Sequence, residues 1–143
     1  MGEPSTIAEQ VYAAYGRGDL DACLRLFAPD CQVTFPGAPP LSGPEQVRPF
    51  LQTQLNAFPN GNHSVQRMIE QGSLVAAELV FRGVHSGPYE TPLGAIPPSG
   101  RQVTFESVDI VEVNAGRITS WRVYLDTASM IAQMGASPVL TSA

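Results

Sequence analysis

One carboxylate interrupts the apolar face of a predicted strand. In the segment "VTFESVDIVEV", which begins at Val103, alternate residues share a face, so Asp109 lies with Phe105 and Val111. An ionised carboxylate there costs free energy unless it is paired, so its pKa is expected to rise above the usual value of about 3.9. Asp109 is therefore predicted to donate or accept a proton, or to orient a histidine. The alternative is a structural aspartate bonded to an arginine or to backbone donors.

Two more residues are candidates for the same acid–base chemistry. His85 ends the inward-facing row of the predicted strand Leu74–His85, where a general acid or base would stand at the mouth of a cavity. An equally weighted interpretation is that His85 fixes the following loop by bonding its backbone. Asp126 follows the last predicted strand and is explained as the N-cap of a final helix, with catalysis as the second interpretation.

The remaining histidine and the carboxylates do not suggest a metal. His63 follows the turn "PNGN" and is expected to be exposed. It is 22 positions away from His85, and no carboxylates cluster near either histidine, so the spacing of a metal-ligand set is absent from the sequence.

The elements that must position these residues fall into two halves. Capping pairs predict two helices in the first half, Thr6 with Glu9 and Ser42 with Glu45, and Asp19 predicts a short helix between them. The segment "CQVTFPG" is predicted to form a strand. Alternating patterns in the second half predict four strands, at His63–Glu70, Leu74–His85, Arg101–Val113 and Arg117–Leu125, before a final helix that ends at Gly135.

This order of elements predicts an α+β fold in which a curved antiparallel sheet carries helices on one face and encloses a cavity. The segment "SGPYETPLGAIPPSG" is predicted to form a long ordered loop over one end of the sheet. Asp109 is expected to line the cavity together with six residues that bind the substrate: Trp121, Phe35, Phe81, Tyr15, Val123 and Phe105.

Composition limits the classes of protein that fit. A chain of 143 residues with 43% hydrophobic content is expected to form one domain over residues 1–143. The net charge of −5, with only eight Lys and Arg, argues against nucleic acids and anionic membranes as partners. No apolar run predicts a membrane span, and the N-terminus lacks the features of a secretory signal. Cys23 and Cys31 are expected to be reduced thiols in the cytoplasm.

The chain resembles a known superfamily. The order of elements, with "YAAYGRGDLDACLRLFAPDCQVTFPG" leading and "VNAGRITSWRVYLD" closing, resembles the nuclear transport factor two-like proteins. That resemblance implies a cone-shaped curved sheet with helices packed on its concave face. Within the superfamily, "GVHSGPYETPLGAIPPSGRQVTF", "GRITSW" and "YLDTASMIAQMG" resemble the SnoaL-like polyketide cyclase group over nearly the whole chain. The superfamily includes isomerases, dehydratases, epoxide hydrolases, cyclases and binding proteins, so the fold alone does not assign a reaction.

Site residues of these relatives carry over only in part. Ketosteroid isomerases imply a buried protonated acid at Asp109, but their base position falls on Phe35 and their tyrosine position on Val11. Limonene epoxide hydrolases have an aspartate where this chain has Val123. SnoaL-like cyclases use an aspartate on the last strand, for which only Asp126 is available, and a histidine on the preceding strand, where this chain has Asp109.

Three functions remain open from the sequence. The leading one is a cofactor-independent enzyme that performs aldol-type cyclisation or isomerisation on an apolar, oxygenated, polyketide-like substrate, with Asp109 and His85 moving the proton. The second is epoxide opening or dehydration on the same scaffold. The third is a non-catalytic ligand-binding or assembly protein, which a pairing of Asp109 with Arg101 or Arg117 would favour.

The solvent-side face of the sheet predicts a second copy of the chain as partner. Val108 and Ile110 lie between Glu106 and Glu112 on the outer side of a central strand. Apolar area of this kind on a sheet face usually binds another surface. We therefore expect a homodimer, with a small apolar organic molecule as the other partner.

Overall fold

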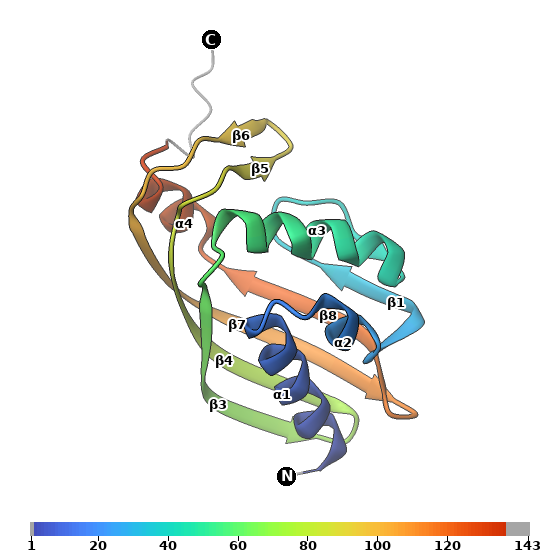
Figure 1. Cartoon of the computed structure of the whole chain (residues 1–143). Helices are drawn as coiled ribbons and strands as arrows, with labels where there is room; N and C mark the ends of the chain where they lie inside the picture. The colour runs from blue at the N-terminus through green and yellow to red at the C-terminus, as the bar shows by residue number, and fades with distance from the viewer. Residues whose placement is uncertain (1, 137–143) are drawn as a thin grey trace.

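The computed structural model describes residues 2–136 and has the predicted α+β architecture (Figure 1). A curved sheet forms one layer, and three helices lie across its concave face: α1 (Glu3–Gly16), α2 (Leu20–Leu24) and α3 (Pro44–Ala57). The last helix, α4 (Thr127–Gln133), lies at one end of the sheet. The predicted domain also includes residues 1 and 137–143, which lie outside the described part.

The main sheet has six strands in the order β2-β1-β8-β7-β4-β3. Their bounds are β1 Phe27–Thr34, β2 Leu41–Ser42, β3 Asn62–Gln71, β4 Leu74–Val84, β7 Gln102–Asn114 and β8 Arg117–Leu125. Neighbouring strands are antiparallel except β1 and β8, which pair in parallel. The sequence predicted only antiparallel pairing, because a parallel pair between the first and last strands depends on how the whole chain closes.

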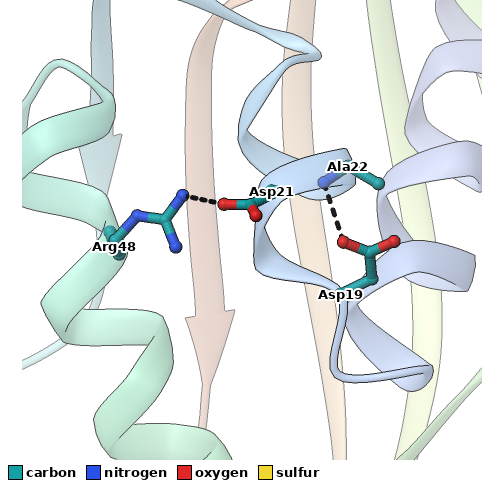
Figure 2. Close-up of polar contacts among 4 residues, drawn as sticks. All are labelled: Asp19, Asp21, Ala22 and Arg48. Carbon is teal, nitrogen blue, oxygen red and sulfur yellow. Dashed lines mark hydrogen bonds and ion pairs between the residues drawn. The ribbon is translucent and has the colours of Figure 1, made fainter.

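Two of the predicted helix caps are present. The Asp19 carboxylate accepts a hydrogen bond from the Ala22 amide at 3.0 Å and starts α2 (Figure 2). Asp126 accepts one from the Ser129 amide, also at 3.0 Å, and starts α4. Figure 2 also shows the ion pair that joins α2 to α3, in which Arg48 donates to Asp21. Both side chains of this pair are well exposed, so the pair contributes at most about 1 kcal/mol.

The two predicted capping boxes are wrong. Helix α1 begins at Glu3, before Thr6, because the Glu70 carboxylate of β3 reaches its N-terminus and accepts hydrogen bonds from the Gly2 amide, the Ser5 amide and the Ser5 hydroxyl. Helix α3 begins after Gly43, whose φ of 78° favours glycine.

At α3, Ser42 makes no side-chain cap with Glu45. Its amide instead donates to the Gln46 side chain at 2.7 Å. In α1 the acceptor of the first-turn amide therefore lies outside the predicted pattern, whereas in α3 no side chain caps the first turn.

The glycine- and proline-rich segment is ordered and contains a small hairpin, β5 (Tyr89–Thr91) with β6 (Gly94–Ile96). The hairpin extends beyond the sheet beside α3 and α4 (Figure 1). Tyr89 is buried against the adjoining core, and backbone hydrogen bonds of His85 with Gly100 and Arg101 close the base of the loop. Within residues 2–136, no helix is long and apolar enough to cross a membrane.

Candidate functional site

A cavity lies between the concave face of the sheet and the helices. Its volume is about 120 Å³, measured as the space open to the centre of a water molecule. One water needs only about 10–15 Å³ by this measure, so the cavity has room for a small organic group. The lining includes Asp109 and all six residues predicted to bind the substrate: Trp121, Phe35, Phe81, Tyr15, Val123 and Phe105.

Asp109 is held in the wall of this cavity by the sheet register. It lies on β7 between Ala77 of β4 and Val123 of β8, and 5% of its surface is exposed. Its Oδ2 accepts a hydrogen bond of 2.6 Å from the hydroxyl of Tyr12. Its Oδ1 is buried and has no hydrogen-bond partner among the described residues. Neither ion pair that the described residues form involves Asp109, so the arginine-paired interpretation receives no support.

Burial dominates the electrostatics of Asp109 and raises its pKa to about 6. The Tyr12 hydroxyl opposes the shift, because its hydrogen bond favours the ionised carboxylate. The nearby indole of Trp121 also lowers the pKa of Asp109, although it makes no hydrogen bond to Oδ1. The direction agrees with the expectation from the apolar strand face. With a pKa of about 6, the Asp109 carboxyl titrates close to neutral pH and can act as a proton acceptor in the cavity.

Tyr12 is the functional residue that the sequence analysis missed. The family tyrosine was expected at Val11, which lines the cavity but carries no hydroxyl. The next residue, Tyr12, supplies the hydroxyl from α1, and its ring packs edge-on against Trp121 with centroids 5.3 Å apart. Burial first, and then the charge of Asp109, raise the pKa of Tyr12, so its hydroxyl stays protonated as a donor. The signal was present: Tyr12 and Tyr15 are three residues apart and share one helix face.

His63 was predicted to be exposed, and this prediction is wrong. The register pairs His63 with Phe81, which places both on the concave face, and both line the cavity. The imidazole packs 4.9 Å from the ring of Phe81 and 5.5 Å from that of Tyr15, measured between centroids. Burial lowers the pKa of His63 to about 4, so the cavity contains a neutral imidazole at pH 7.

His85 does not reach the cavity and is not a proton-transfer partner of Asp109. It lies eight residues along β4 from Ala77, the strand partner of Asp109, which is about 26 Å at 3.3 Å per residue. Its side chain is fully buried, and its Nδ1 receives hydrogen bonds from the Ser99 hydroxyl at 2.9 Å and the Ser99 amide at 3.3 Å. His85 therefore fixes the loop, which was the alternative interpretation. Burial also lowers its pKa.

Asp126 is likewise outside the cavity lining. Its side chain is exposed, and its carboxylate is used as the N-cap of α4. The catalytic assignment of Asp126 is therefore corrected to a structural one. The acid that a SnoaL-like cyclase would have on the last strand has no counterpart at the cavity, where that strand contributes Trp121, Val123 and Leu125.

One charged side chain lines the cavity in the part of the chain that the structure describes. This residue is Asp109, and none of the eight arginines lines the cavity. Within the described residues 2–136, no group of three His, Cys, Asp or Glu is placed to hold a metal ion. The site can accept a proton at Asp109, donate a hydrogen bond from Tyr12 and enclose an apolar ring among aromatic side chains.

The fold and the site together define the class of protein. A cone-shaped α+β domain with a buried acid in its cavity has the nuclear transport factor two-like, ketosteroid isomerase-like architecture. The model of the SnoaL-like polyketide cyclase family matches residues 5–134, so the chain belongs to this family.

Several solved structures share this fold. IdmH, a proposed polyketide cyclase from Streptomyces antibioticus, is 31% identical with a TM-score of 0.77, covering 94% of this chain and 100% of that one. A proposed SnoaL-like polyketide cyclase from Jannaschia sp. CCS1 has a TM-score of 0.85 at 19% identity, covering 95% and 94%. AclR, a proposed hydroxylase from Streptomyces galilaeus, has a TM-score of 0.80 at 18% identity, covering 98% and 85%. No curated protein matched the chain.

Proposed function

We propose that this protein is a cyclase-type enzyme that performs acid–base chemistry on an apolar, oxygenated, polyketide-like molecule. The observation that carries the proposal is the pair formed by Asp109 and Tyr12. One carboxylate oxygen is held by the phenol at 2.6 Å, while the other is buried at the cavity wall without a partner. An unpartnered buried acceptor costs free energy, and a ligand hydrogen in the cavity would satisfy it.

The proposed reaction is an enolisation followed by ring closure. Oδ1 of ionised Asp109 removes a proton from a carbon next to a substrate carbonyl: the C–H bond breaks, an O–H bond forms, and the electron pair moves to the enolate oxygen. The enolate carbon then attacks a second carbonyl of the same molecule and forms the C–C bond. The new alkoxide takes the proton back from Asp109, which returns to its carboxylate form, so the reaction needs no cofactor.

Tyr12 would change partner during this cycle. It donates to the ionised carboxylate in the resting site, and that bond weakens when Asp109 takes up the proton. The phenol is then free to donate to the enolate oxygen, where a preorganised donor typically lowers a barrier by about 3 kcal/mol. The neutral imidazole of His63 lies beside Tyr12, with ring centroids 6.1 Å apart, and would add a polar contact for a substrate oxygen.

The other two candidate functions are weaker. Epoxide opening or hydrolysis on this scaffold would need a second acid, but Val123 faces Asp109 across the β7–β8 pair. A purely ligand-binding role does not explain why a carboxylate is kept in an aromatic cavity at a cost in stability. The experiment below separates the binding-protein alternative from the proposal.

The test is exchange of carbon-bound hydrogen in D₂O. We expect the wild type to accelerate deuteration next to the carbonyl of 2-tetralone, measured by proton NMR. Asp109→Asn should reduce the rate by about two orders of magnitude or more, whereas Asp126→Asn should leave it within a factor of two. Equal rates for wild type and Asp109→Asn, with both bound to the ketone, would favour the binding-protein alternative.

We also propose that the protein is a homodimer through the outer face of its sheet. Val108 and Tyr124 are strand partners on that face, with 37% and 52% of their surfaces exposed, and Ile69 on the edge strand β3 is 61% exposed. Exposed apolar area on a sheet face favours a partner. Sedimentation should give a dimer at micromolar concentration, and Val108→Asp should shift it to a monomer, because two-fold symmetry repeats the new charge across the interface. A wild-type monomer would contradict this proposal.

The cytoplasm is the proposed location. The thiols of Cys23 and Cys31 are both free and buried, as is typical of a reducing compartment.

A further inference from the structure

A groove adjoins the cavity at the end where the hairpin lies. Its walls are the β5–β6 hairpin, the loop that follows β1, and faces of α3 and α4, which come together at this end of the molecule (Figure 1). Four side chains line both spaces: Phe35, Phe50, Gln54 and Met130. Because the same side chains separate the groove from the cavity, a ligand that passes between them would occupy both.

The two volumes indicate that the cavity alone does not hold a complete substrate. Sites that enclose drug-sized molecules have volumes of roughly 300–1,000 Å³, and the cavity has about 120 Å³. The groove has about 430 Å³ by the same measure. The cavity therefore accommodates the reacting ring beside Asp109, and the remainder of a larger molecule has to extend into the groove.

The charges around both spaces restrict what that remainder can be. Among the described residues 2–136, Glu90 is the only charged side chain that lines the groove, as Asp109 is in the cavity. All eight basic residues of the chain are arginines, and none of them lines either space. A phosphate or carboxylate on the ligand would therefore meet a carboxylate and no cation, whereas an uncharged chain would meet apolar side chains such as Tyr89, Ile96 and Ile131.

We propose that the groove is a second binding compartment for an uncharged, extended substituent of the substrate. This inference rests on the proposed function only for the position of the reacting ring beside Asp109. The β5–β6 hairpin would then form the outer wall of this compartment.

The test uses 4-alkylphenols of increasing chain length and the fluorescence of Trp121, the one tryptophan of the chain, which lines the cavity. We expect 4-methylphenol to bind weakly and affinity to rise about three- to four-fold for each further methylene, the amount expected when a methylene is buried. Ala38→Phe, which enlarges a half-buried side chain of the groove lining, should abolish the dependence on length. Ala128→Phe is the matched control, because Ala128 is exposed on α4 outside the groove. An affinity independent of length, or an unchanged dependence in Ala38→Phe, would overturn the proposal.

A second arm tests charge. 6-(4-Hydroxyphenyl)hexanoate should bind at least ten-fold more weakly than its methyl ester at pH 8, and Glu90→Gln should reduce the difference. Equal binding of acid and ester would overturn the uncharged assignment. These outcomes are separable from those of the exchange experiment, because Asp109→Asn should lose exchange yet keep its dependence on chain length. If Asp109→Asn loses exchange but binding affinity does not depend on chain length in either protein, the proposed function stands and the groove proposal is wrong.

Discussion

Replacing Asp109 with asparagine should stabilise the protein at pH 8 and leave its stability nearly unchanged at pH 4. The folded protein holds the carboxyl of Asp109 with a pKa of about 6, against about 3.9 in the unfolded chain. Two pKa units correspond to about 3 kcal/mol. Because only 5% of the Asp109 surface is exposed, water screens little of this amount.

The sign follows from proton binding. Between about pH 4 and pH 6 the folded state binds the Asp109 proton and the unfolded state releases it, so the free energy of unfolding falls as the pH rises through this range. Above pH 6 the wild type carries the whole cost of a buried charge. The asparagine variant carries none at any pH. It keeps the volume and an oxygen that accepts from Tyr12, so the two proteins should be similar at pH 4.

The assay is urea denaturation of both proteins at the same concentration from pH 4 to pH 8, followed by far-UV circular dichroism. The difference in the free energy of unfolding should grow in favour of Asp109→Asn by about 3 kcal/mol over this range. Asp30→Asn is the control, because Asp30 is exposed and its removal should change stability by less than about 0.5 kcal/mol throughout. A difference that does not vary with pH, or a variant less stable than wild type at pH 8, would refute the burial argument.

Two further predictions concern the hydrogen bonds around the site and the first helix. Tyr12→Phe removes a donor to Oδ2, and since such bonds to a charged group are worth about 1.5–3 kcal/mol, the pKa of Asp109 should rise by about 1–2 units. The pH profile of deuterium exchange should shift upward accordingly and not shift for Tyr15→Phe. Glu70→Ala should lower the melting temperature by several degrees and speed amide exchange in the first turn of α1, whereas Glu70→Gln, which keeps an acceptor, should do less. An unchanged pH profile in Tyr12→Phe would contradict the first prediction. Unchanged amide exchange at the start of α1 in Glu70→Ala would contradict the second.

The strands and the cavity lining could be predicted because both depend on alternation, which is local. The period of two identified the inward faces of β4 and β7, and from them the positions of Phe81, Phe105 and Asp109. Asp19 and Asp126 were found as caps for the same reason, since a capping carboxylate lies within three residues of its donor.

The features that could not be predicted depend on contacts between distant parts of the chain. Tyr12 and Asp109 are 97 residues apart, and no local pattern connects a helix tyrosine to a strand acid. Glu70 caps a helix from 65 residues away, so the nearer pair at Thr6 was chosen incorrectly. His63 was placed by its turn rather than by its register with Phe81, which only the folded sheet fixes.

The position of Asp109 in the sheet keeps its carboxylate on the cavity side and away from the solvent-facing side of the sheet. It lies on β7, which is hydrogen-bonded on both sides, and shifting β7 by one residue would move Val103, Val111 and Val113 from the core to the outer face. Exposing one charge would therefore cost three buried valines, each worth about 1.5 kcal/mol or more, against the roughly 3 kcal/mol that burying the charge costs. The register of β7 is therefore kept, and the Asp109 carboxyl stays buried although its ionised form would be more stable in water. A local conflict of this kind, enforced by the surrounding packing, is expected at a functional site.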